Sequence, residues 1–122
     1  MAKPKPDRRT EQRIAQEIVV DAYGPEERAM GWYYYLEAQL HFPFQGKCTA
    51  LRATSPLRKG QQIEVIGLAS ADECEHEMFV TVSWEERHLA VPLAQLEPLR
   101  VDKTTRQAIK DWRYWLAQGY EF

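Results

Sequence analysis

The spacing of hydrophobic residues in the first quarter of the chain predicts two helices that form a hairpin. The first helix runs to about Tyr23, and either Asp7 or Thr10 caps its N-terminus. One stripe along it consists of Ile14, Ile18 and Ala22, which recur every four residues. Gly24-Pro25 ends this helix and starts the next, because glycine suits a helix C-cap and proline the first helical turn.

The second predicted helix extends to Phe42-Pro43, where the proline pushes the residue before it toward an extended conformation. Its apolar face consists of Ala29, Trp32, Tyr33, Leu36 and Leu40. Glu26 and Glu27 lie in its first turn, where the helix dipole favours negative charge. Together with Asp21 they form an acidic elbow between the two helices.

After residue 43 the pattern changes to short alternating segments separated by turn residues. Five strands are predicted, at 47–53, 62–68, 76–84, 87–91 and 97–100, with one short helical turn at 92–96. In the third strand Met78, Val80 and Val82 face one side, whereas Glu75 and Glu77 face the other, about 7 Å apart. Short strands in this order favour a small SH3-like β-barrel.

A last helix begins at Thr104 or Thr105, because Ile109, Trp112 and Leu116 recur at helical spacing. The aromatic end, 120–122, predicts a docked tail. The expected fold is therefore α+β: a flexible basic arm (1–9), a helical hairpin (10–42), a five-stranded SH3-like barrel (43–100) and a C-terminal helix (101–122), all in one compact unit.

Composition and charge limit the functional classes. The 122 residues are 44% hydrophobic and carry a net charge of −2. The basic residues are concentrated at the start, with five before residue 14, which leaves 11 basic and 16 acidic side chains for the rest. This acidic body argues against a generic nucleic-acid binder. The chain shows neither a secretory leader nor a membrane-spanning stretch, so we expect a cytoplasmic protein. We also expect it to be a monomer.

The densest chemistry lies at residues 72–77, where Asp72, Glu73, Glu75 and Glu77 place four carboxylates in six positions. Like charges at short range repel unless solvent or a cation relieves them. Calcium prefers six to eight oxygen ligands, which clustered carboxylates and backbone carbonyls supply. A solvated acidic loop is the alternative.

The elbow of Asp21, Glu26 and Glu27 is a second candidate, although Glu26 and Glu27 also suit the helix dipole alone. Neither stretch has the spacing of an EF-hand loop. A calcium site must therefore be assembled from separate parts of the chain, and elbow and loop would supply each other's missing ligands if they met.

Other chemistries have weaker support. Cys74, His76 and Cys48 lack the spacing of a structural zinc site, and two separated cysteines are typical of buried thiols. His76 is expected on the apolar face of its strand. No nucleophile elbow, phosphate loop or metalloprotease motif is present. The aromatic runs 33–35 and 112–115 are able to stack on nucleotides, but packing explains them better.

Longer stretches resemble the CcbP-like calcium-binding family known from cyanobacteria. They are IVVDAYGPEERAMGWYYYLEAQLHFPF, SPLRKGQQIEVIGLASADECEHEMFVTVSW, LAVPLAQLEPL and DWRYWLAQGYEF, and the likeness covers residues 13–122. The resemblance implies a cytosolic protein that holds or buffers free calcium through acidic surface groups and becomes more compact as it binds. Its two acidic motifs correspond to Asp21, Glu26 and Glu27 and to Asp72, Glu73, Glu75 and Glu77.

Three hypotheses follow. The first is a non-enzymatic protein that buffers or senses calcium with carboxylates of the 72–77 loop and the 21–27 elbow. The alternative is an SH3-like module that recruits a protein or nucleic acid and binds metal incidentally. A hydrolase is the third, without a recognisable constellation of catalytic residues.

Overall fold

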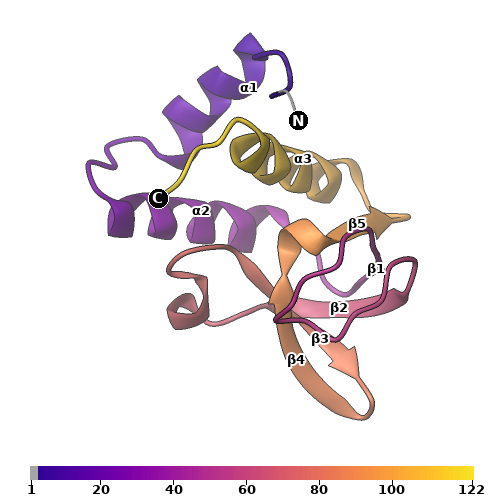
Figure 1. Cartoon of the computed structure of the whole chain (residues 1–122). Helices are drawn as coiled ribbons and strands as arrows, with labels where there is room; N and C mark the ends of the chain where they lie inside the picture. Colours follow the sequence, from indigo (N-terminus) through magenta and orange to yellow (C-terminus); the bar gives the residue numbers. More distant parts are fainter. Residues whose placement is uncertain (1–2) are drawn as a thin grey trace.

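A computed structural model, which describes residues 3–122, has helices packed on one antiparallel sheet (Figure 1). The helices are α1 (Arg8–Arg13), its π-helical continuation η1 (Ile14–Ile18), α2 (Pro25–Gln39) and α3 (Lys103–Ala117), with two short turns, η2 (Ala71–Cys74) and η3 (Leu93–Gln95). The strands are β1 (Phe44–Cys48), β2 (Gln62–Leu68), β3 (Phe79–Trp84), β4 (Arg87–Pro92) and β5 (Leu96–Leu99). The predicted α+β class is confirmed.

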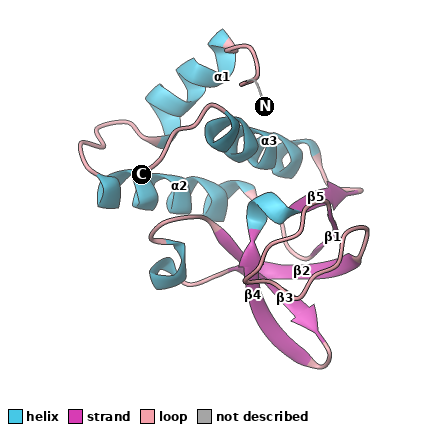
Figure 2. Cartoon of the chain, viewed as in Figure 1, coloured by secondary structure: helices cyan, strands magenta, loops and turns pink. Residues whose placement is uncertain are grey.

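Five strands are present, but the sheet is open. The first strand runs over Phe44–Cys48, so the prediction that it spans 47–53 is wrong. Their order is β4-β3-β2-β1-β5, so β4 and β5 are the two edges, and within the described residues no ladder joins them (Figure 2). Closure into an SH3-like barrel is therefore not confirmed. The physical reason is that the sheet shares its core with helices: Trp32 of α2 and Trp112 of α3 belong to the same buried cluster as the strand residues.

The first helix is shorter than expected. Its predicted cap is confirmed, because the Asp7 carboxylate accepts a hydrogen bond from the Thr10 amide at 3.0 Å. The helix ends at Ile18, so the prediction that it reaches Tyr23 is wrong. At Gly31 the backbone of α2 approaches the Ile18 carbonyl so closely that a Cβ atom would not fit. The predicted arm (1–9) lies partly outside the described residues, and Pro4 within it accepts a hydrogen bond from Gln118 at 2.8 Å.

The third strand begins at Phe79, not at residue 76, which corrects two expectations. Glu75 and Glu77 lie in the bend before the strand and do not share a strand face. His76 is exposed and precedes the strand, so the expectation that it lies on the strand's apolar face is wrong. The strand starts late because the Phe79 amide donates to the Cys74 sulfur at 3.3 Å, which bends the chain between them.

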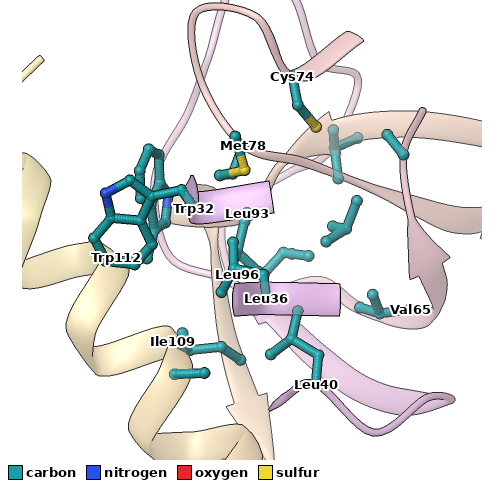
Figure 3. Packing of buried hydrophobic residues seen from close by; sticks show 14 of the residues in the cluster. Trp32, Leu36, Leu40, Val65, Cys74, Met78, Leu93, Leu96, Ile109 and Trp112 are labelled. Carbon is teal, nitrogen blue, oxygen red and sulfur yellow. The ribbon is translucent and has the colours of Figure 1, made fainter. Parts of the chain in front are cut away.

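The helices and the sheet meet in an aromatic core (Figure 3). Trp32 and Trp112 are fully buried and contact each other edge to face, with ring centroids 5.1 Å apart. Trp115 also packs edge to face on Trp32, with ring centroids 5.6 Å apart. The packing interpretation is thus confirmed for Trp112 and Trp115, and Tyr33 and Tyr35 are partly buried against the core, whereas Tyr34 is 61% exposed. In the described part of the chain, none of the helices is long and apolar enough to cross a membrane.

A buried carboxylate joins the three helices. Asp111 of α3 is fully buried and accepts hydrogen bonds from Arg13 at 2.7 and 2.8 Å, from the Tyr35 hydroxyl at 2.8 Å and from Gln107 at 2.9 Å. Burial and the hydrogen bond to Asp111 raise the pKa of Tyr35 above its ordinary value. Every partner donates to Asp111, and Arg13 forms an ion pair with it, so the carboxylate connects all three helices.

Candidate metal centre

Three separate segments form a cleft that is lined with carboxylates, which we call the acidic cleft. Its walls are the N-terminal half of α2, the segment from η2 to the bend before β3, and the C-terminal tail together with the end of α3; Arg52 also lines it. Its volume is about 1330 Å³. The carboxylates that line it are Glu26, Glu27, Asp72, Glu75, Glu77 and Glu121.

The α2 wall is fixed by how the helix starts. Gly24 is extended and Pro25 occupies the first helical position, so Glu26 and Glu27 fall in the first turn, where both are exposed. About two turns further along α2, the Tyr33 hydroxyl donates to the Ala69 carbonyl at 2.9 Å. This hydrogen bond connects α2 to the residues that lead into η2, so it fixes the position of one cleft wall relative to the other.

The opposite wall is an acidic bend anchored at both ends. Cys74 and Met78 are buried on either side of residues 75–77, and Figure 3 shows both side chains in the core cluster. Burial raises the pKa of the Cys74 thiol, which favours a neutral structural thiol over a metal ligand. With its ends held in this way, the bend presents Glu75 to solvent and leaves Glu77 partly covered.

Glu77 has a partner within the protein. Arg52, from the connection between β1 and β2, donates to the two carboxylate oxygens of Glu77 at 2.6 and 3.2 Å. The pair raises the pKa of Arg52, mainly through the side-chain hydrogen bond. Arg52 also lines the acidic cleft. Sequence reasoning missed this contact because the two residues lie 25 positions apart on loops with no shared pattern.

The third wall is the tail, and the expectation that it is docked is confirmed. Tyr120 packs on Trp115 with centroids 4.8 Å apart, and Phe122 packs on Trp112 at 5.8 Å. Arg28 donates to the Phe122 backbone oxygen at 2.9 Å. Glu121 therefore reaches the acidic cleft. It was not a candidate from sequence, although the aromatic residues on both sides of it were the signal that its segment is held in place.

The structure brings together five of the seven carboxylates that the sequence nominated: Glu26, Glu27, Asp72, Glu75 and Glu77. Asp21 and Glu73 are not among the residues that line the cleft. Asp21 lies in the elbow with a left-handed backbone (φ 59°), and Glu73 is exposed on η2. The two acidic motifs therefore share one cleft, but not with all their members.

The carboxylates share the cleft without forming a ready-made cage. Across residues 3–122, no three His, Cys, Asp or Glu side chains are grouped closely enough to hold a metal ion. The zinc alternative finds no support in this arrangement, because Cys48 and Cys74 are both buried free thiols.

The chain is similar over its whole length to proteins of known structure. A family model described as calcium binding, Calci_bind_CcbP, matches residues 12–116. The crystal structure of Anabaena CcbP is 44% identical, covers 100% of both chains and gives a TM-score of 0.89. A calcium binding protein in the calcium-binding form is 43% identical, covers 100% of both chains and gives a TM-score of 0.87. No curated protein matches. The chain therefore belongs to the CcbP family of calcium-binding proteins.

Proposed function

We propose that this protein is a non-enzymatic calcium buffer that takes up the ion in the acidic cleft. In this proposal Glu26 and Glu27 on α2 and Asp72, Glu75 and Glu77 on the opposite wall supply oxygen ligands to one ion. The observation that carries the proposal is the convergence of these distant acidic segments on one cleft, in a chain that belongs to a calcium-binding family.

Calcium binding would relieve repulsion among these carboxylates. Asp72 and Glu75 are exposed and accessible to an incoming ion, and so are Glu26 and Glu27. Calcium accepts flexible geometry and six to eight oxygens, so waters and backbone carbonyls of the bend complete the coordination. Magnesium requires near-ideal octahedral geometry and gives up water reluctantly, so an open cleft of this kind favours calcium.

The absence of a preformed cage among residues 3–122 supports a buffer more than a tight site. Part of the binding free energy must draw the walls together, which lowers the affinity and makes the protein more compact on binding. We place the protein in the cytoplasm as a monomer, as the sequence predicts. Asp21 and Glu73 remain predicted ligands of lower rank, since neither lines the cleft.

Titration calorimetry with calcium and with magnesium tests the proposal. We expect a calcium Kd on the order of 1 to 100 μM and weaker binding of magnesium. Glu26→Gln/Glu27→Gln is expected to weaken calcium binding at least tenfold. Glu85→Gln/Glu86→Gln, which removes the same charge from the β3–β4 turn, is the matched control and keeps near wild-type affinity. Equal heats for both cations, or equal losses in both variants, would show that the cleft is not the site.

A further inference from the structure

We infer that Arg52 competes with calcium for Glu77 and so sets the calcium affinity of the acidic cleft. In the structure the Arg52 guanidinium is paired with the Glu77 carboxylate, and calcium must displace it to bind there. This inference rests on the proposed function, and it assigns a role to a basic residue within an otherwise acidic site.

The first support is the geometry of the pair. Arg52 uses two nitrogens to engage both oxygens of Glu77, at 2.6 and 3.2 Å. A carboxylate that binds calcium also offers one or both of these oxygens, at 2.3–2.6 Å from the ion. Arg52, with its two hydrogen bonds, and a bidentate calcium ion therefore require the same two oxygens of Glu77. Arginine and calcium cannot both bind the two oxygens in this way.

The second support is charge. Among the described residues that line the cleft, Arg52 carries the one permanent positive charge, against six carboxylates. A guanidinium beside the site also repels an incoming divalent cation. The neighbouring Arg28 does not line the cleft, and it donates to the backbone oxygen of Phe122 instead. Arg52 is thus the basic group that calcium meets.

The third support is that the two partners are held differently. Glu77 directly precedes the fully buried Met78, and its side chain is 20% exposed. The Arg52 side chain is 39% exposed and lies in a connection where Leu51, Ala53 and Thr54 are exposed as well. When calcium binds, Arg52 is therefore the partner that leaves, because it swings into solvent without disturbing the core.

Calcium titration of Arg52→Gln tests the inference. The variant is expected to bind calcium about threefold to tenfold more tightly than wild type, since an exposed ion pair and a nearby charge are both lost. Arg58→Gln is the matched control: it removes the same charge from the same connection but lies outside the cleft, and its affinity should stay within about twofold.

Two further variants separate pairing from charge. Arg52→Lys keeps the charge but loses the planar fork, so its affinity should fall between those of wild type and Arg52→Gln. In a Glu77→Gln background, Arg52→Gln should tighten binding less than in wild type, because the contested carboxylate is gone. Full tightening in that background would show that Arg52 acts only through its long-range field and would overturn the competition.

The inference and the proposed function fail in different ways. If Arg52→Gln binds calcium like wild type, or more weakly, while Glu26→Gln/Glu27→Gln still loses affinity, the cleft stands and the competition is wrong. If neither variant changes the calcium Kd, the cleft itself is not the site. Displacement predicts a calcium-dependent shift of the Arg52 side-chain nitrogen resonances in the wild-type protein, measured by NMR, and a much smaller shift in Glu77→Gln; equal shifts in both proteins would overturn the competition.

Discussion

Asp111 and the residues of the acidic cleft both present carboxylates, but Asp111 is buried among donors whereas most of the cleft carboxylates are exposed. Asp111 is fully buried and is bonded by Arg13, Tyr35 and Gln107. In the cleft, Asp72 and Glu75 are exposed, and within residues 3–122 only Glu77 of the cleft carboxylates is in an ion pair. The protein itself supplies the hydrogen-bond partners of Asp111, whereas water or cations from solution must supply those of the exposed cleft carboxylates.

This difference separates structure from function. A buried charge is costly unless donors surround it, so Asp111 is kept where it binds three helices together. Exposed, clustered charges contribute little to the fold, and their mutual repulsion is relieved only when a cation arrives. Replacing a carboxylate should therefore cost stability at Asp111 and calcium affinity in the cleft.

The largest expected effect is on the fold. Asp111→Ala leaves Arg13 and the Tyr35 hydroxyl without their shared acceptor, and we expect a loss of about 3–5 kcal/mol in the free energy of unfolding. Urea denaturation followed by tryptophan fluorescence measures it. Glu37→Ala, at an exposed position of α2, is the control and should change stability by less than about 0.5 kcal/mol. A small loss for Asp111→Ala would remove the contrast with the cleft.

Calcium itself gives the next largest effect. At a free concentration of one hundred times Kd, a ligand that binds only the folded state stabilises it by about 2.7 kcal/mol. For a domain of this size we expect Tm to rise by about 10 °C, measured by calorimetry with calcium and with chelator. A conservative Asp111→Asn variant should start from a lower Tm but gain a similar increment, because the two regions are independent.

The cleft carboxylates should show the reverse pattern from Asp111. We expect Asp72→Asn/Glu75→Gln to change the stability of the calcium-free protein by no more than about 0.5 kcal/mol, since both side chains are exposed. Its calcium affinity should fall at least tenfold, which is about 1.4 kcal/mol. Denaturation with chelator and titration calorimetry measure the two quantities. A marked loss of stability with unchanged affinity would make this wall structural.

The smallest effect tests whether hydrogen-bond partners alone, without burial, are enough to make a carboxylate contribute to stability. Asp102 is exposed, yet hydrogen bonds from His41 and then from Thr105 lower its pKa to about 2. Because the folded pKa lies below the ordinary value of 3.8, this stabilisation is present above about pH 4 and is lost as the pH falls toward 2. NMR titration of the carboxyl group should give that low midpoint, and Asp102→Asn should remove this part of the acid sensitivity.

Most of the fold follows from local patterns in the sequence. The bounds of β2 and the position of α2 were predictable because alternation and the Gly24-Pro25 signal act over a few residues. The end of the first helix at Ile18 was not, since it depends on how closely Gly31 of α2 approaches. Local patterns also could not show that the sheet stays open, because this depends on helices from distant parts of the chain that fill its core.

The candidate site was predictable in its residue types more than in its geometry. The acidic runs at 26–27 and 72–77 were predicted as ligands because of their charge density, and five of the seven predicted residues line one cleft. We predicted that Glu75 and Glu77 share a strand face because the alternating pattern extends to residues before Phe79. The hydrogen bond from the Phe79 amide to the Cys74 sulfur instead bends the chain between these two residues. Arg52 and Glu121 needed the fold, because neither is near the others in sequence.

The most direct test is a double-mutant cycle in calcium affinity between Glu27→Gln on α2 and Glu75→Gln on the opposite wall. If one ion bridges the walls, the two changes in binding free energy should depart from additivity by about 0.5–3 kcal/mol. Additivity within about 0.3 kcal/mol would contradict the account, because it would mean that each wall acts on its own and that calcium does not join them.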